Sequence, residues 1–290
     1  MEGFYTALGT PLDDMGGFYA PGFKKQIEDQ IDAGAVGVLV LGSMGMQPCI
    51  RHADCQKVAM AAVEAAKGRC QITVGVMDNS IATVLDRIDA LESLPIDGVV
   101  VTTPFYFTAT RPELLTFFRT IATRSPFPVY LYDLPSVTKI KIDATLVHAL
   151  MSHPNIRGIK TADLVLSRAI RNDAAVKEDF QILCSNLDAL DFAYKCGLKT
   201  GLDGMFTMTA PLISKAYCAM KNDDFATAAK AISDIIAFRD ILIEVEVMAG
   251  FTYAMNLLGY KGNFHTDYSP LVTEDQKEVV RSFMQSIGLL

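Results

Sequence analysis

The sequence lacks the features that would tie the protein to a membrane or to a nucleic acid. No uninterrupted apolar run approaches the ~20 residues that a membrane-spanning helix needs. The opening segment MEGFYTALGTPLDD has no basic region followed by an apolar stretch, which is the pattern of a secretory signal. Lys and Arg number 26 against 33 Asp and Glu, so the formal net charge is −7. This balance disfavours nucleic acids and anionic membranes as partners. We therefore expect a cytoplasmic protein that acts on metabolites.

Patterns typical of zinc sites are absent as well. The six cysteines form no CxxC pair, and the four histidines do not cluster with them. Structural zinc sites need closely spaced thiolates and imidazoles, so no metal site is predicted. We expect reduced cysteines that pack inside a cytosolic protein. The six are Cys49, Cys55, Cys70, Cys184, Cys196 and Cys218.

Half of the 290 residues are hydrophobic, which is enough to bury a large core. Short runs rich in β-branched residues alternate with amphipathic segments along most of the chain. Eight runs are expected to be strands: Phe4–Leu8, Val36–Leu41, Gln71–Val76, Asp97–Thr102, Pro128–Tyr132, Ile156–Lys160, Phe180–Cys184 and Thr200–Leu202. Helices are expected between them at Pro21–Ala33, Ala53–Ala66, Ile81–Leu91, Pro112–Thr123 and Asp143–Met151.

The expected strands are apolar throughout, which is typical of parallel strands covered by helices. Eight strand–helix units favour an α/β fold, a closed (β/α)8 TIM barrel, over an open doubly wound sheet. No GxGxxG motif opens a helix after the first strand, which disfavours a dinucleotide-binding sheet. From Asp224 onward the pattern is purely helical, with a capping box from Thr273 to Gln276. We expect residues 1–223 to form the barrel and residues 224–290 a helical extension packed on it.

Catalytic residues of such barrels come from the carboxyl ends of the strands. Lys160 ends an apolar strand, where burial disfavours the ammonium form, and a neutral amine can attack a ketone to form an imine. The alternative is that Lys160 extends along apolar surface to solvent at the rim of the barrel. Lys139 and Lys141 alternate with Ile140 and Ile142 before a helix, a pattern typical of solvent-exposed lysines.

Three other strand ends carry polar groups. Tyr132 could donate a proton, although a tyrosine here is also typical of plain packing with a satisfied hydroxyl. The loop Gly42–Gly45 precedes a helix and offers free backbone N–H groups, which suit a carboxylate. Asp203 ends the last strand, where a charge is unusual, and its structural alternative is a loop or cap residue.

Five segments together resemble the dihydrodipicolinate synthase / N-acetylneuraminate lyase family of class I Schiff-base aldolases. The opening ALGTPLDDMGG is similar to the family's TPF-x-x-x-G start, and GSMGM is similar to its G-[ST]-[ST]-G-E loop. TTPFYF, YDLPSVT and GIKTAD are similar to xxPYY, YNxPxxTG and GxK-x-[AST]-x, in the family's order and at its spacing. The later SNLDALDFAYKCG and GLDGMF extend the resemblance over nearly the whole chain.

The resemblance implies covalent catalysis without a metal or an organic cofactor. Lys160 would form an imine with pyruvate or a pyruvate-derived 2-oxo acid. Tyr132 would relay protons, and Ser43 stands where the family has its relay serine or threonine. Tyr106 matches a tyrosine that family members insert into the site of a neighbouring subunit, so a homotetramer or a homodimer is expected. The backbone N–H groups of Ser43 and Met44 would hold the substrate carboxylate.

Departures from the family pattern bear on the substrate. Val137 stands where dihydrodipicolinate synthases carry an arginine that binds the carboxylate of the semialdehyde, and valine offers no charged hydrogen bond. Met44 replaces the second hydroxyl of the loop, and Asp133 replaces asparagine. The segment 185–188 does not plainly match the acidic sugar-binding pair of the lyases. The candidate substrate-binding residues are Met44, Val137, Ser185 and Asp203.

These departures favour a Schiff-base aldolase or lyase acting on pyruvate or a pyruvate-derived 2-oxo acid, such as a 2-keto-3-deoxy sugar acid. One alternative is 4-hydroxy-tetrahydrodipicolinate synthase itself, with another residue acting in place of Val137. A Schiff-base dehydratase or deaminase of the same family is the next. The last is a barrel that binds a 2-oxo acid without turning it over, which the intact set of Lys160, Tyr132 and Ser43 disfavours. No motif identifies the acceptor aldehyde.

Overall fold

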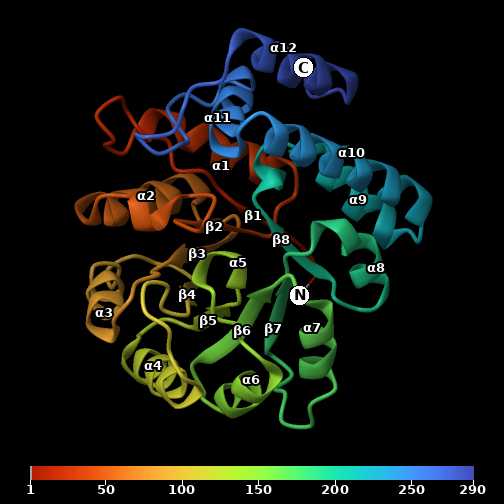
Figure 1. The fold of residues 1–290 in the computed structure, drawn as a ribbon. Coiled ribbons are helices and arrows are strands. Elements are labelled where there is room, and N and C mark those ends of the chain that lie inside the picture. The colour runs from red at the N-terminus through yellow and green to blue at the C-terminus, as the bar shows by residue number, and fades with distance from the viewer. Residues whose placement is uncertain (1) are drawn as a thin grey trace.

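Eight parallel strands form a closed barrel in the computed structural model, which describes residues 2–290 (Figure 1). Each strand pairs with the next along the chain, and β8 pairs with β1. The predicted (β/α)8 barrel is therefore confirmed. The strands are β1 (Gly3–Ala7), β2 (Gly37–Val40), β3 (Gln71–Gly75), β4 (Gly98–Thr102), β5 (Val129–Tyr132), β6 (Ile156–Thr161), β7 (Gln181–Cys184) and β8 (Thr200–Asp203).

Helices surround the barrel and follow its strands along the chain (Figure 1). Those of the barrel are α1 (Lys24–Asp32), α2 (His52–Ala66), α3 (Ile81–Asp89), α4 (Arg111–Arg124), α5 (Pro135–Thr138), α6 (Ala144–Met151), α7 (Leu164–Arg171), α8 (Leu190–Lys195) and α9 (Ala210–Lys221). Three more follow: α10 (Phe225–Glu244), α11 (Val247–Leu257) and α12 (Glu274–Ser286). Short 3₁₀ turns lie at Ala20–Gly22, Gln47–Cys49, Leu187–Ala189 and Met205–Thr207.

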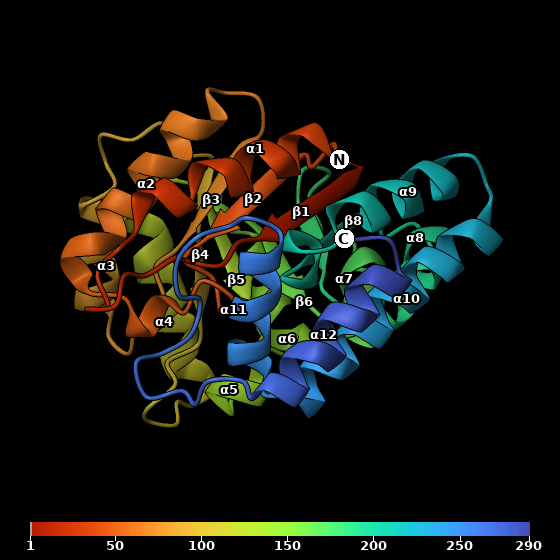
Figure 2. The same ribbon diagram turned by 90° about the horizontal axis from the view of Figure 1, so that it is seen from above.

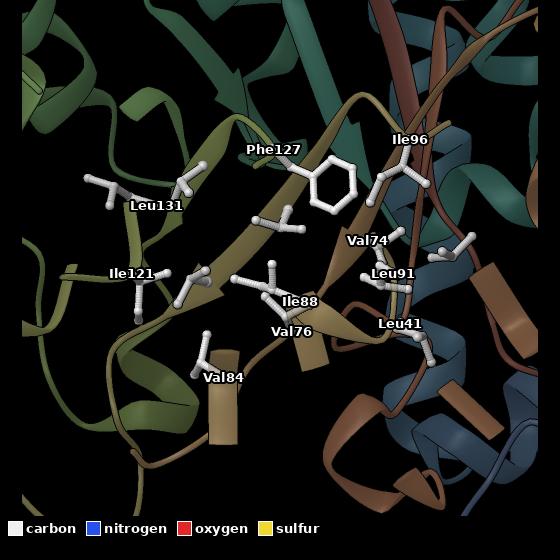
Figure 3. Close-up of a cluster of buried hydrophobic side chains, with 14 of the residues drawn as sticks. Leu41, Val74, Val76, Val84, Ile88, Leu91, Ile96, Ile121, Phe127 and Leu131 are labelled. Carbon is white, nitrogen blue, oxygen red and sulfur yellow. The ribbon is translucent and has the colours of Figure 1, made fainter. Parts of the chain in front are cut away.

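Alternate residues of each strand face opposite sides of the sheet. On β4, Val99 and Val101 face the helices, whereas Val100 faces the barrel interior. Figure 3 shows part of the outer layer, where Val74 of β3 and Ile88 of α3 belong to one fully buried cluster. Burying one such side chain contributes about 1.5–3 kcal/mol. Both faces of each strand are apolar for this reason, which explains the absence of polar alternation in the sequence.

The C-terminal helices gather on the side of the barrel near β1 and β8 (Figures 1 and 2). Helix α10 contacts α8 and α9, and α12 contacts α10 and α11. The Asp224 side chain caps α10 by accepting a hydrogen bond from the Thr227 N–H at 3.1 Å. Phe4 of β1 and Phe238 of α10 belong to the same buried cluster, so the core runs continuously from the barrel into the tail. The division at residue 224 stays a prediction.

The prediction of a purely helical tail is wrong for residues 258–273. Here Asn263 forms an isolated bridge with Leu12, and their backbones exchange two hydrogen bonds of 2.8 Å. Gly259 and Gly262 adopt φ angles of +85° and +117°, which end the helix and turn the chain. The capping box of Thr273 with the following Gln276 is present at the start of α12.

All six cysteines are free in the structure. Cys55 and Cys184 are buried as expected, but Cys49, Cys196 and Cys218 are exposed, so the expectation that all six pack inside is wrong. Between residues 2 and 290, no helix has the length and apolar character needed to cross a membrane.

Candidate active site

Lys160 and Tyr132 lie side by side at the ends of neighbouring strands, because β5 and β6 pair in that register. Leu131 and Ile159 face the surrounding helices, so the alternation of each strand turns Tyr132 and Lys160 into the barrel. Nζ of Lys160 donates a hydrogen bond of 3.0 Å to the Tyr132 hydroxyl and lies 4.2 Å from the centre of its ring. Lys160 is only 5% exposed, so it does not extend to solvent at the rim.

Ser43 completes a row of three polar side chains. It follows β2, and its Oγ lies 3.3 Å from the Tyr132 hydroxyl, with either oxygen able to donate. The hydroxyl of Tyr132 therefore touches both the amine of Lys160 and the hydroxyl of Ser43. The structure brings together the three residues that the sequence singled out from three separate strand ends.

The loop that carries Ser43 is bracketed by two strained residues. Leu41 and Met46 have φ angles of +55° and +52°, a region that residues other than glycine rarely adopt. Thr10 fixes the loop from outside by donating a 2.7 Å hydrogen bond to the Gly45 carbonyl. Within residues 2–290, the backbone N–H groups of Ser43 and the next residue have no protein acceptor. Such free donors suit a carboxylate.

A cavity of about 730 Å³ opens above these residues at the carboxyl ends of the strands. Four of the candidate site residues besides Lys160 and Tyr132 line it: Ser43, Met44, Ser185 and Asp203. The other lining residues are Ala7, Asp133, Leu134, Pro135, Ser136, Lys141, Ala162, Asp163, Gly204, Met205, Arg239, Leu242, Ile243, Val247 and Phe251.

Two candidate residues lie away from this cavity. Val137 belongs to α5 and is 58% exposed, and it is not among the lining residues. Tyr106 is 78% exposed and packs edge to face on Phe107, with ring centres 4.8 Å apart. Its loop is held by Asn79, whose Oδ1 accepts hydrogen bonds from the backbone N–H groups of Phe105 and Tyr106 at 2.9 and 2.8 Å. Neither side chain contacts the Lys160 row within one chain.

The whole chain matches a known protein family. The Dihydrodipicolinate synthetase family matches residues 1–286. The chain belongs to this family. Members are lyases, class I pyruvate-dependent aldolases, and the family uses a lysine Schiff base. The resemblance and the expected class of enzyme are thereby confirmed.

Relatives and solved structures agree with this membership. The 4-hydroxy-tetrahydrodipicolinate synthase of Acidiphilium cryptum is 29% identical over 291 residues, which cover 100% of this chain and 99% of that protein. The Bradyrhizobium diazoefficiens protein of the same name is also 29% identical, and the match covers 100% of this chain and 97% of that protein. Dihydrodipicolinate synthase from Thermotoga maritima superposes with a TM-score of 0.91 at 20% identity, covering 100% and 99% of the two chains. An E. coli K12 prophage protein of the family, solved with pyruvate, gives 0.90 at 21%, with the same coverage.

Asp133, where the family pattern has asparagine, joins three segments at the mouth of the barrel. It is buried and accepts hydrogen bonds from the Thr161 hydroxyl at 2.8 Å and from the Ile142 N–H at 3.0 Å. It also accepts a hydrogen bond from Lys141. The carboxylate thus connects the end of β5 to β6 and to the segment before α6.

Lys141 lines the cavity and forms ion pairs with two carboxylates, Asp133 and Asp163, the latter at 3.1 Å. Burial opposes its charge, but these two hydrogen bonds raise the pKa of Lys141 above its ordinary value. Both lysines are exposed, as expected. Lys141 differs in that it also pairs with two carboxylates, whereas the amine of Lys139 donates to the Ser136 carbonyl at 2.7 Å. No local signal distinguishes the two lysines, because both carboxylates lie in other segments.

Arg239 of α10 also lines the cavity, and sequence reasoning missed it. Its guanidinium binds Asp188 through two hydrogen bonds of 2.7 and 2.9 Å, and it also contacts Asp240. These hydrogen bonds, with that to Asp188 foremost, raise the pKa of Arg239. The same pairing lowers the pKa of Asp188. The helical period places Arg239 and Ile243 on one face of α10, but nothing local shows that this face covers the barrel mouth.

Asp203 both caps a turn and faces the cavity. It accepts a 2.8 Å hydrogen bond from the Met205 N–H, which begins the 3₁₀ turn after β8. Burial raises the pKa of Asp203, and the hydrogen bond from the Met205 N–H and the nearby Lys160 only partly oppose this. Over residues 2–290, no three His, Cys, Asp or Glu side chains gather where they could hold a metal ion.

Proposed function

We propose that Lys160 forms an imine with pyruvate or a pyruvate-derived 2-oxo acid, and that the enzyme makes or breaks a carbon–carbon bond next to it. The observation that carries this proposal is the row Lys160–Tyr132–Ser43 at the base of a cavity of about 730 Å³. A neutral lysine amine is a nucleophile for ketones.

The chemistry follows from this arrangement. The Lys160 amine attacks C2 of the 2-oxo acid, and water leaves as the protonated imine forms. The imine withdraws electrons, so the C3–C4 bond can break, leaving an enamine, while the C4 hydroxyl loses its proton and becomes an aldehyde. Tyr132, within hydrogen-bond reach of Nζ, moves protons to and from these atoms and exchanges them with Ser43. The free N–H groups after β2 bind the substrate carboxylate.

A second candidate is 4-hydroxy-tetrahydrodipicolinate synthase, the name of full-length relatives at 29% identity. That reaction brings a second carboxylate into the site. In this chain Val137 is apolar and points to solvent, and Lys141 already pairs with Asp133 and Asp163. We therefore place this reaction second.

The proposal also covers the assembly, the location and the cofactors of the enzyme. The exposed pair of Tyr106 and Phe107 is offered as a contact between copies, in a homotetramer or a homodimer. One related solved structure is a monomeric dihydrodipicolinate synthase variant, so assembly differs among relatives. We also propose a cytoplasmic location and catalysis without a metal or an organic cofactor.

Borohydride trapping tests the covalent step. The protein is incubated with each of a panel of 2-oxo acids, reduced, digested and examined by mass spectrometry. With pyruvate, we expect one lactyl-sized adduct on the peptide that contains Lys160. Lys160→Arg should abolish the adduct, while Lys139→Met, which removes a neighbouring exposed lysine, should leave it intact. An adduct on Lys139 or Lys141, or none with any 2-oxo acid, would contradict the proposal.

A further inference from the structure

The cavity above Lys160 has one wall that is apolar. This wall comes from the C-terminal helices, where Ile243 at the end of α10 and Val247 at the start of α11 are 57% and 43% exposed. Large apolar side chains left open to solvent inside a cavity are typical of a binding surface. Leu242 of α10 and Phe251 of α11 also line the cavity but are almost fully buried.

The charged groups on the remaining sides are already paired. Lys141 contacts both Asp133 and Asp163, so one cation faces two carboxylates. Arg239 uses two guanidinium nitrogens on Asp188. A carboxylate that entered with the substrate would meet like charge beside Lys141, or would have to displace a bidentate partner of Arg239. Breaking a paired, partly desolvated ion is unfavourable, so this part of the cavity disfavours an acid.

We infer that the acceptor half of the substrate is an uncharged aldehyde with an apolar body, which lies against the apolar wall formed by Ile243 and Val247 over the buried Leu242 and Phe251. This inference rests on the proposed function, because it takes the 2-oxo acid to be bound at Lys160. An aldehyde held at this wall can meet the nucleophilic carbon of the enamine. The wall and Lys160 line the same cavity, and that carbon forms next to Nζ of Lys160.

The same wall disfavours a 2-keto-3-deoxy sugar acid, the example of a substrate that was expected from the sequence. Each hydroxyl of a sugar loses water on entering and needs a hydrogen-bond partner in the site, and without one it is bound less tightly. The apolar wall offers no partner. Ser136, Ser185 and Asp203 also line the cavity and can serve a hydroxyl of the substrate, but they are not part of the apolar wall.

The test compares three short aldehydes at saturating pyruvate: butanal, glyceraldehyde and 4-oxobutanoate. Condensation is followed by the loss of aldehyde, and borohydride trapping of pyruvate is measured in parallel. We expect kcat/KM for butanal to exceed that for each of the other two by about tenfold or more. If pyruvate is trapped on Lys160 but glyceraldehyde or 4-oxobutanoate is preferred, the inference is wrong and the proposed function stands. If neither pyruvate nor any other 2-oxo acid of the panel is trapped on Lys160, the proposed function itself fails.

Two variants test whether the apolar wall causes the preference for butanal. Ile243→Asn should lower kcat/KM for butanal about tenfold without changing pyruvate trapping, because the side chain is exposed and its loss does not open the core. The matched control is Val279→Asn, an equally modest change at a 45% exposed residue of α12 that does not line the cavity. Equal effects of the two substitutions would contradict a role for the wall.

Asp163→Asn tests whether the carboxylates paired with Lys141 disfavour an acidic aldehyde. Asparagine can still accept the hydrogen bond that Asp163 takes from the Leu166 N–H at 2.9 Å, so α7 keeps its cap. One of the two negative charges beside Lys141 is lost, and we expect kcat/KM for 4-oxobutanoate to rise several-fold relative to butanal. If the ratio does not change, paired charges do not exclude acids from the cavity and the inference loses this support.

Discussion

The hydroxyl of Tyr132 lies 3.0 Å from Nζ of Lys160, across the pair formed by β5 and β6. This contact arises from the register of two strands and requires no loop to position it. The same hydroxyl is 3.3 Å from Ser43, so a proton that leaves the amine has a defined next acceptor. Groups that are fixed on strands in this way need little reorganisation during the reaction.

Replacing Tyr132 by phenylalanine should separate imine formation from turnover. Lys160 remains buried, so trapping of pyruvate by borohydride should persist, while turnover falls by about 10²–10⁴-fold because a positioned acid–base group is lost. Tyr130→Phe is the matched control, since Tyr130 lies on the same face of β5 one layer deeper. If Tyr132→Phe turns over within about twofold of the wild type, Tyr132 does not act as the proton relay.

Activity as a 4-hydroxy-tetrahydrodipicolinate synthase should be poor. A hydrogen bond to a charged group is worth roughly 1.5–3 kcal/mol, and Val137 cannot supply one. Its absence should cost about 10–100-fold or more in kcat/KM. Val137→Arg should raise activity with pyruvate and aspartate semialdehyde, whereas Val165→Arg, at another exposed valine, should not. The measurement is a coupled assay.

A wild-type kcat/KM of about 10⁴ M⁻¹s⁻¹ or above with aspartate semialdehyde, together with no gain from arginine at position 137, would reverse this ranking. The 4-hydroxy-tetrahydrodipicolinate synthase reaction would then become the first candidate, and the apolar wall would need another explanation.

Tyr106 should take part in the contact between copies of the chain. It is exposed beside Phe107, on a loop that Asn79 holds rigidly. Tyr106→Ala should weaken the oligomer in light scattering and lower activity with it, whereas Tyr268→Ala, at an equally exposed tyrosine, should do neither. A fully active wild-type monomer of 31.6 kDa would rule out both the contact and a shared site.

Asp203→Asn should stabilise the protein at neutral and alkaline pH. Burial raises the pKa of Asp203 in the folded state above 3.8, so folding favours the protonated acid. The protonated Asp203 therefore stabilises the folded state fully below the pKa that Asp203 has in the unfolded chain. This stabilisation is lost as the pH rises through the pKa of Asp203 in the folded state. The melting temperature of the variant should exceed that of the wild type by a few degrees at pH 8, and the difference should shrink as the pH falls toward 4. Asp86→Asn, at an exposed carboxylate of α3, should show no such trend.

The barrel and the Lys160 row could be predicted from the sequence because their signals are local. Strands covered on both faces are apolar throughout, and each of the eight runs lies within a residue or two of an observed strand. Lys160 and Tyr132 end such runs and Ser43 follows one, and parallel strands of a barrel end on the same side. Their convergence therefore follows from the fold class alone.

Lys141 and Arg239 could not be predicted in this way, because their partners are distant in sequence. The alternation around Lys141 is the same whether the lysine faces solvent or a buried carboxylate, and only the folded chain brings Asp133 and Asp163 to it. Arg239 reaches the cavity because α10 packs along α8 and α9. The error over residues 258–273 has a similar origin, since the bridge to Leu12 spans nearly the whole chain.

The apolar wall and the lysine row belong to separate stretches of the chain. The residues proposed for covalent chemistry lie between Ser43 and Lys160, whereas Ile243 and Val247 come from helices added after the eighth strand. Substitutions in the later stretch can reshape the acceptor wall without moving the nucleophile. The range of aldehydes accepted can therefore diverge between duplicated copies of the gene while the first half-reaction is inherited unchanged.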